Sequence, residues 1–551
     1  MHKKRYFLYS IAIFVFSLLY FAWGIGNTSL WDIDEPIYAQ ALKEMIAHHN
    51  LLVPTFNNQL LPDKPILNYW LMWCGTQIFG WNSFGLRIGS ALVGALFILL
   101  LWIGVKRLYN PRIALFTAAI TATLLHSSII FRSATPDPLL ILTVSAALLF
   151  FLIGYTENAD KRFLIAFYIS LAFATLDKGP IGFLLPGLII VLFLLGRKNL
   201  PFLWKEGQLR IGIPLFLLIV LPWYVAVGLE TQWSWDKVFL IQQNIGRFDS
   251  SMQGHQGPWF YYLISILLGM LPWSLFFPQT FSLLRQLWHH ADANNRRKHS
   301  FLLIWAVVWT AFFSLSATKL PSYVWESYPP LAIFVAWYFD QRLLMHNTKP
   351  SRLDWLAPAI LFAIGVALSV FGGWILPKQE PQLPNLLLIG LPYSSAAIVA
   401  LVFLRRQNFR AALLSFAIGA LILSAMLVFL YTPEFNYLKP SRAMGEEIAK
   451  IQQGAPYQLA SWQWFQPDFL FYAGRGAMPV HHLTNLDEIA PLAQQQPLYL
   501  VCPEIDIKNV QAVVPPPYHV APILVRFELY SREKIALLQI RKSGPFSRAN
   551  G

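Results

Sequence analysis

Thirteen long apolar segments dominate this sequence and decide the solvent in which it folds. Each is close to the roughly 20 residues that an α-helix needs to cross about 30 Å of hydrocarbon. The segments are 6–26, 84–105, 112–131, 138–156, 162–177, 180–196, 211–228, 259–284, 301–317, 321–339, 355–376, 385–404 and 411–430. The chain is 56% hydrophobic and only 13% charged, against about 25% charged residues in soluble domains. We therefore expect an α-helical polytopic membrane protein with about thirteen transmembrane helices.

The basic residues predict the orientation of these helices across the membrane. Alternate loops carry at least two Lys or Arg each, whereas the short loops between them, such as "LDKGP" and "SATKLPS", carry one each. Cytoplasmic loops are the basic ones, so the N-terminus is expected in the cytoplasm and the C-terminus in the periplasm. Residues 1–26 begin like a signal peptide, but the apolar run is too long and no small-residue cleavage site follows. A retained first helix is expected.

The segments outside the apolar runs predict a second domain. The first and fourth outer loops, about 27–83 and 229–258, are long, and the first contains two stretches that read as interfacial helices. After residue 431 the composition changes, and helix-like and strand-like segments alternate. We expect a transmembrane domain at 1–431 and a small periplasmic α/β domain at 432–551.

Charge and cysteine content reduce the number of functions that the chain could have. The net charge of +14 could suggest nucleic acid, but the basic residues lie in short loops and form no stripe interleaved with aromatics, so no nucleic-acid partner is expected. Cys74 and Cys502 do not make a disulfide framework. Cys502 lies in the apolar "PLYLVCPE" and is interpreted as a small buried hydrophobe.

The conspicuous charged residues all fall on the outer side of this topology. The acids are Asp34, Glu35, Asp63, Asp137 and Asp177, and the bases are Lys64, Lys178, Arg247 and Lys319. Taken singly, most have a structural explanation: an acid at a helix start favours the helix dipole, and a Lys after an acid at a turn forms an ion pair. Their convergence on one face indicates chemistry at that interface instead of a path through the bilayer.

An ordered series of motifs carries a family resemblance. "WDIDEPIYA", "LPDKPILNYW", "RSATPDP", "LDKGPIG", "NIGRFDSSMQGHQGPWFYY" and "TKLPSYVWESYPPLA" follow one another along the chain. Together they resemble the polyprenyl-phosphate-dependent membrane glycosyltransferases of the GT-C type. The likeness is greatest to the transferases that move 4-amino-4-deoxy-L-arabinose from undecaprenyl phosphate to lipid A.

The resemblance implies roles for particular residues. It implies that Asp34 and Asp137 are the catalytic carboxylates. It implies contacts to the lipid phosphate at Lys64, Arg247 and Tyr323. The need for fixed cations beside that phosphate adds Lys178 and Lys319, and Glu35 completes the expected donor site. In some members of the family a divalent cation binds at the positions of Asp63 and His255, although His255 alone is more simply an exposed loop residue. The chain also departs from the family, because it has "DEPIYA" at 34–39 where the lipid A enzymes tend to have Asp-Glu-Thr-Arg-Tyr-Ala.

The chemistry expected of that family suits these residues. A lipid-linked sugar phosphate needs fixed cations that stabilise the departing phosphate, and a carboxylate that orients or deprotonates the acceptor. The expected partners are a polyprenyl-phosphate sugar donor, lipid A or another envelope glycan or protein as acceptor, and membrane lipids. The expected location is the bacterial inner membrane.

Three other functions stay open on the sequence. Mannosyl transfer to exported proteins keeps the chemistry and changes the acceptor. A secondary transporter or lipid flippase would place ionisable residues at mid-membrane and often show inverted repeats, and neither is evident here. A scaffold of envelope assembly would leave the external charges unexplained.

Overall fold

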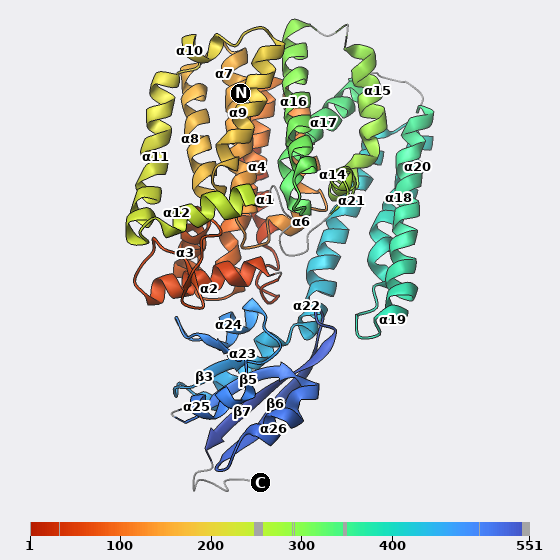
Figure 1. Cartoon of the computed structure of the whole chain (residues 1–551). Coiled ribbons are helices and arrows are strands. Elements are labelled where there is room, and N and C mark those ends of the chain that lie inside the picture. Colours follow the sequence, from red (N-terminus) through yellow and green to blue (C-terminus); the bar gives the residue numbers. More distant parts are fainter. Residues whose placement is uncertain are drawn as a thin grey trace. The chain divides into compact units, whose positions relative to one another are not determined.

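The computed structural model describes residues 2–31, 33–246, 257–288, 290, 292–344, 350–494 and 496–542. These residues form two compact units (Figure 1). The first contains the chain up to Ile25 and Pro62–Phe429, and the second contains Gly26–Leu61 with the described residues from Leu430 onward. The domain division at 431 stays a prediction. The sequence gives no sign that the segment after the first helix groups with the C-terminal residues.

The first unit is helical throughout. Its elements are α1 (His2–Ala22), α3 (Leu67–Phe79), α4 (Ser83–Leu108), α5 (Pro111–Ala122), α6 (Ser127–Ile130), α7 (Asp137–Thr156), α8 (Lys161–Lys178), α9 (Ile181–Gly196), α10 (Phe202–Lys205), α11 (Leu209–Glu230), α12 (Ser234–Val238), η1 (Phe239–Gly246), α14 (Tyr261–Gly269), η2 (Trp273–Phe276), α15 (Phe277–Leu287), α16 (Ala293–Leu315), η3 (Pro321–Ser327), α17 (Tyr328–Leu344), α18 (Arg352–Val370), η4 (Phe371–Ile375), α19 (Leu376–Gln379), η5 (Leu387–Gly390), α20 (Leu391–Arg405) and α21 (Phe409–Met426).

Short polar residues set where many of these helices begin. An N-terminal Asn, Asp or Ser side chain accepts a hydrogen bond from the first backbone N–H groups, which have no partner within the helix. The capping residues are Asn82 of α4, Asn110 of α5, Asp160 of α8, Asp292 of α16, Ser351 of α18 and Asn408 of α21. The loops between apolar runs therefore carry the start signals of the next helix.

Helix length and composition test the number of expected spans. Among the described residues, eight helices are long and apolar enough to cross a membrane, or nine if the bent pair Tyr261–Gly269 and Trp273–Leu287, which turns by 105°, counts as one. The chain is thus a multi-pass membrane protein, but the count of thirteen is not confirmed. Several expected spans are shorter helices, such as α5 and the 16-residue α9.

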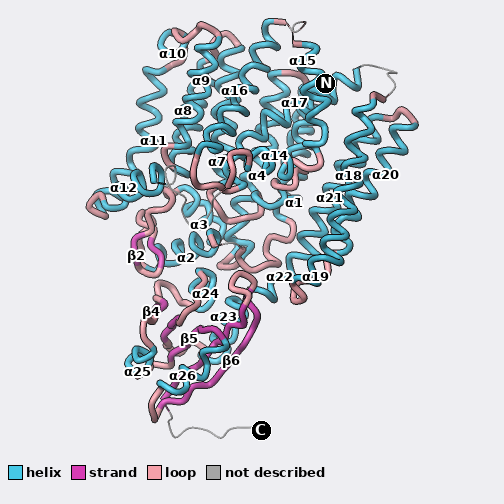
Figure 2. Tube along the Cα trace, turned by 45° about the vertical axis from the view of Figure 1, so that its right-hand side comes forward, coloured by secondary structure: helices cyan, strands magenta, loops and turns pink. Residues whose placement is uncertain are grey.

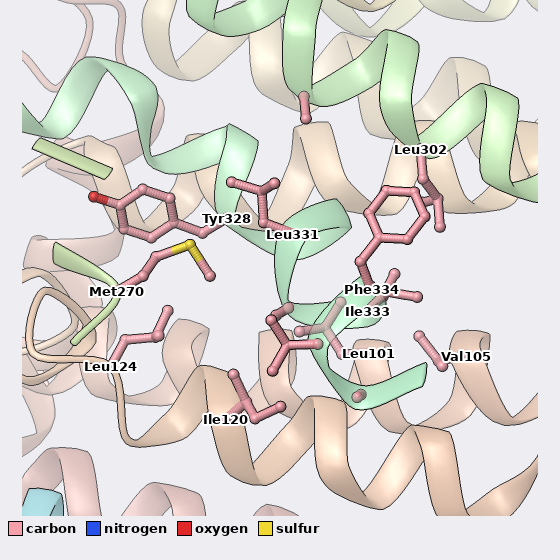
Figure 3. Close-up of a cluster of buried hydrophobic side chains, with 14 of the residues drawn as sticks. Leu101, Val105, Ile120, Leu124, Met270, Leu302, Tyr328, Leu331, Ile333 and Phe334 are labelled. Carbon is pink, nitrogen blue, oxygen red and sulfur yellow. The ribbon is translucent and has the colours of Figure 1, made fainter. Parts of the chain in front are cut away.

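The core of the first unit lies where α17 passes between other helices. Figure 3 shows its side chains Leu331, Ile333 and Phe334 among those of neighbouring elements, namely Leu101 and Val105 of α4, Ile120 of α5 and Leu302 of α16. Lipid is as apolar as these side chains, so close packing holds such helices together more than the hydrophobic effect does. The result is a rigid frame for the helix ends.

The second unit contains a five-stranded sheet, with the strands drawn in magenta in Figure 2. The strand order is β4 (Val480–His482), β3 (Gln458–Ser461), β5 (Leu498–Pro503), β7 (Glu533–Lys542) and β6 (Tyr518–Glu528). Strands β3, β4 and β5 are parallel, while β7 pairs antiparallel with β5 and β6. Every residue of β5 is buried, including Cys502, as a strand covered on both faces should be. The predicted α/β architecture is confirmed.

The other elements of this unit are mostly short. They are α2 (Asp34–Ala47), β1 (Thr55–Phe56), β2 (Gln59–Leu60), α22 (Thr432–Phe435), η7 (Asn436–Leu438), α23 (Pro440–Gln452), α24 (Pro467–Ala473), η8 (Leu486–Glu488), α25 (Ile489–Leu492), η9 (Glu504–Asp506) and α26 (Ile507–Val513). The division between the units falls within η6 (Leu427–Tyr431). The strand-like stretches of the sequence correspond to β3 to β7.

Two buried charges anchor α2 within the second unit. The Glu44 carboxylate is fully buried and accepts hydrogen bonds from Thr55 Oγ1 at 2.8 Å and from the backbone N–H groups of Asn57 at 2.8 Å and Asn58 at 3.1 Å. Lys43 Nζ donates to the Phe471 and Gly474 carbonyls of the α24 region at 2.9 and 2.6 Å. Burial lowers the pKa of the Lys43 ammonium to about 8. These polar contacts form only in the folded state, and they therefore hold the first outer loop in place within the second unit.

Replacing Glu44 by Ala should destabilise the second unit by about 3 kcal/mol or more, because buried donors lose a charged acceptor. Thermal unfolding of the detergent-solubilised full-length protein measures this effect. Glu447→Ala, which removes only an exposed ion pair with Lys450 on α23, is the matched control. Equal melting temperatures for the two variants would contradict this role of Glu44.

Candidate functional site

Several helix ends of the first unit meet around one cavity of about 570 Å³. The C-terminus of α8, the N-terminus of α9, the C-terminus of α16 and the following η3 all contribute lining residues. Consecutive antiparallel helices bring such ends to the same side of a bundle. The predicted outer residues Asp63, Lys64, Lys178 and Tyr323 line this cavity together.

The Lys178–Asp137 ion pair borders the cavity, and its Lys178 side chain lines the polar part of the wall. Lys178 Nζ donates to Asp137 Oδ1, and the two side chains are only 15% and 17% exposed. Asp137 is the first residue of α7 and Lys178 the last of α8, so each charge also complements the dipole of its own helix. Lys178 Nζ lies 5.3 Å from the centre of the Tyr323 ring, a cation–π contact.

A second ion pair borders the same cavity. Lys64 Nζ lies 2.8 Å from Asp63 Oδ1, with side chains 12% and 16% exposed. Both cations are thus already held at fixed positions by carboxylates. An anionic ligand would find preorganised ammonium groups, which is the arrangement that stabilises charge without reorganisation.

Most of the remaining wall is apolar. It consists of side chains from α7, α9, η1 and α16, including Leu140, Ile181, Leu184, Leu240, Phe312 and Phe313. A cavity with ammonium groups in one part and aliphatic and aromatic side chains in the other suits an amphiphile whose head carries a phosphate. The geometry therefore favours a lipid-linked anion over a wholly polar ligand.

Two buried carboxylates of this region were not weighed among the predicted site residues. Glu326 lines the cavity, is 2% exposed, and its Oε2 has no hydrogen-bond partner among the described residues. Asp177, one of the outer acids of the sequence but not a predicted site residue, is fully buried beside Lys178. The signal for Glu326 was an acid inside the apolar run 321–339.

Three other predicted site residues are not among those that line the cavity. Lys319 does not line the cavity; its Nζ donates to the Ser314 and Ser316 carbonyls at 2.9 and 2.8 Å at the end of α16, and burial lowers its pKa. Asp34 and Glu35 open α2 in the second unit, where Glu35 Oε2 accepts from the Trp31 N–H at 2.6 Å. Glu35 therefore has a structural role at the helix start.

The expected divalent cation finds little support in the described residues. Arg247 and His255 lie outside them. Within the described ranges, no group of three or more His, Cys, Asp or Glu side chains could hold a metal ion. Asp63 is in addition neutralised by Lys64. We derive no chemical step through a metal.

Comparison with solved structures identifies the fold. The structure of ArnT from Cupriavidus metallidurans bound to undecaprenyl phosphate matches with a TM-score of 0.78 and 20% identity, covering 96% of this chain and 98% of that one. The apo oligosaccharyltransferase of Archaeoglobus fulgidus matches with a TM-score of 0.51 and 14% identity, covering 92% and 71%. The chain has the GT-C fold of membrane glycosyltransferases.

Sequence comparisons point to one branch of that class. A family model described as dolichyl-phosphate-mannose-protein mannosyltransferase matches residues 63–225. The undecaprenyl phosphate-alpha-4-amino-4-deoxy-L-arabinose arabinosyl transferase of Pseudomonas aeruginosa UCBPP-PA14 is 31% identical over 354 residues, which is 62% of each chain. The transferase 1 of that name from Pseudomonas fluorescens Pf-5 is 28% identical over 477 residues, 83% of this chain and 84% of its own. The resemblance expected from the motifs is confirmed.

The ion pair at the cavity can be tested by a double-mutant cycle. Lys178→Gln leaves Asp137 buried without its cation and should destabilise the protein by about 3–5 kcal/mol. Asp137→Asn in the same chain should restore most of that stability, because the unpaired charge is gone. Thermal unfolding of the single and double variants measures the coupling, and additive effects would contradict a direct pair.

Proposed function

We propose that this chain is an integral membrane glycosyltransferase that takes a sugar from a polyprenyl phosphate and transfers it to lipid A or a related envelope acceptor. The observation that carries the proposal is the cavity that joins two fixed ammonium groups to an apolar wall. The names of the relatives supply the donor, undecaprenyl phosphate carrying 4-amino-4-deoxy-L-arabinose.

The proposed reaction is a displacement at the anomeric carbon. An acceptor oxygen attacks C1, the bond from C1 to the phosphate oxygen breaks, and polyprenyl phosphate leaves with the electron pair. Lys64 and Lys178 stabilise the phosphate as its negative charge grows. Arg247 and Tyr323 are further proposed contacts to the phosphate, while Lys319 and Glu35 support the surrounding loops.

The two carboxylates Asp34 and Asp137 have different proposed roles. We assign Asp34 as the residue that orients the acceptor oxygen or removes its proton, and Asp137 as the residue that holds Lys178 in place. With a phosphate acceptor, as on lipid A, no proton has to be removed and Asp34 mainly positions the nucleophile. With a hydroxyl acceptor, base catalysis contributes about 10²–10⁴-fold.

Charge balance favours an amino sugar in this cavity. Among the described side chains that line it or pair with a lining residue, Lys64 and Lys178 are matched by Asp63 and Asp137, and Glu326 is a third acid without an ion pair. A donor with a neutral sugar adds a further negative charge, whereas the ammonium of a 4-amino sugar cancels that of its own phosphate. Glu326, with an oxygen that lacks a partner, is the proposed contact for that ammonium.

We place the reaction at the periplasmic face of the bacterial inner membrane. The basic loops support a cytoplasmic N-terminus, and the C-terminal α/β unit would then lie in the periplasm.

A second candidate is mannosyl transfer to exported proteins, because the matching family model carries that description over residues 63–225. The decisive experiment supplies purified protein with undecaprenyl-phosphate aminoarabinose or a polyprenyl-phosphate mannose, and offers lipid A or an unfolded exported protein. The proposal predicts labelled lipid A with the first donor. Labelled protein with the second would favour the alternative.

Asp34→Asn should abolish transfer in membranes without lowering the amount of protein, because the amide neither removes a proton nor carries the charge. Mass spectrometry of lipid A together with immunoblotting measures both quantities. Asp487→Asn, an exposed change in the same unit, is the control. Retained transfer by Asp34→Asn would overturn the assignment of Asp34.

Glu326→Gln should lower kcat/KM for the 4-amino donor by about tenfold or more and change that for a 4-hydroxy donor much less. The reason is that a charge-assisted hydrogen bond is worth roughly 1.5–3 kcal/mol. Competition between the two donors in one assay gives the ratio. An equal loss with both donors would show that Glu326 has a general structural role and does not contact the amine of the donor.

A further inference from the structure

A second cavity of about 660 Å³ lies along α1, away from the proposed donor site. Its walls come from α1, α4 and α5, and its lining is mainly aromatic and aliphatic, with an arginine on each side, Arg5 and Arg112. Nothing in the proposed glycosyl transfer uses these residues. A cavity of this size falls in the range of about 300–1,000 Å³ that is typical of ligand sites.

The mouth of this cavity lies at the end of the helical unit opposite the donor site. Arg107 near the end of α4 pairs with Glu157 just after α7 at 2.5 Å, so the C-termini of α4 and α7 lie at one end. The donor cavity is bordered by the Asp137–Lys178 pair at the N-terminus of α7. Figures 1 and 2 show the chain's N-terminus at the same end as α10, which follows α9.

Cations gather at this mouth with few counter-ions. The Arg5 Nε donates to Tyr9 Oη at 2.7 Å, and the Lys106 ammonium stands 5.2 Å from the Tyr6 ring and 5.4 Å from that of Trp102. Arg112 Nε lies 2.8 Å from the buried Asp340, while its side chain stays 49% exposed. Each guanidinium has five N–H donors, so these contacts leave donors for a phosphate.

The length of the cavity matches one leaflet. Arg5 and Phe16, which both line it, are eleven residues apart on α1. At 1.5 Å per residue this spans about 16 Å, roughly half of the ~30 Å hydrocarbon core. A chain seated along Tyr9, Ile13 and Phe16 would therefore reach the middle of the bilayer from a headgroup at Arg5.

We propose that this cavity binds an anionic phospholipid of the leaflet opposite the reaction, with its phosphate at Arg5, Lys106 and Arg112 and one acyl chain along α1. Basic pockets between membrane helices recognise anionic headgroups in this way. Arginine suits the task because its planar donors match phosphate geometry. A zwitterionic lipid carries a cation in its own headgroup. Because Arg5, Lys106 and Arg112 would repel that cation, such a lipid would bind less well.

The test compares lipids on the purified full-length protein. Dioleoyl phosphatidylglycerol and dioleoyl phosphatidylcholine are added in turn to the protein in detergent, and native mass spectrometry counts the retained lipids. We expect phosphatidylglycerol to be retained preferentially and to raise the melting temperature. Each cation removed should weaken its binding by about fivefold.

The informative variant is Arg5→Gln with Lys106→Gln, which leaves the Arg112–Asp340 pair intact. Its matched control is Arg197→Gln with Lys198→Gln, two exposed cations at the end of α9. A third variant, Ala12→Phe, fills the apolar part and should displace the lipid while leaving every cation in place. Retention of phosphatidylglycerol by the first and third variants at the level of the control, or equal retention of the two lipids by the native chain, would overturn the proposal.

Discussion

A charge placed at the edge of the hydrocarbon core has to be paired, and the Lys178–Asp137 ion pair is the contact on which the proposed site depends. Without Asp137, the nearly buried Lys178 would bear the cost of desolvation alone. With it, the ammonium stays charged at a fixed point where α7 begins and α8 ends. The Lys64–Asp63 pair repeats the arrangement. Chemistry that needs preorganised cations beside lipid is thereby compatible with a stable membrane protein.

The second unit combines the C-terminal residues with a segment from near the start of the chain. It contains not only the sheet but also Gly26–Leu61, whose α2 carries Asp34 at its first position. Lys43 binds carbonyls near α24, and the Lys439 ammonium donates to the Leu30 carbonyl at 2.9 Å. Lys439 is also 3.5 Å from Asp468, a carboxyl whose pKa burial raises. The C-terminal residues therefore hold the loop that presents the proposed catalytic carboxylate.

Much of the fold and of the candidate site could be predicted from the sequence, for reasons that particular residues show. Apolar runs of about 20 residues predicted the helices, and the alternation of helix-like and strand-like segments after residue 431 predicted the α/β sheet. Motif order placed Asp63, Lys64, Lys178 and Tyr323 together, because polar residues at successive outer turns converge when antiparallel helices pack. The exact number of spans is not confirmed, because helix existence is encoded locally, whereas the length and straightness of α5, α9 or the bent α14–α15 pair depend on packing. Glu326 was overlooked because hydropathy treats η3 and α17 as one apolar run.

Transfer of a sugar from a lipid-linked donor to an acceptor is the activity proposed for this protein. The most direct measurement incubates the purified protein in liposomes with a panel of undecaprenyl-phosphate sugars and lipid A, and follows free undecaprenyl phosphate and the mass of lipid A together. We expect that the 4-amino-4-deoxy-L-arabinose donor is consumed and that lipid A gains the mass of that sugar in equal amount. Movement of intact donor across the liposome membrane, with no undecaprenyl phosphate released and lipid A unchanged, would contradict it.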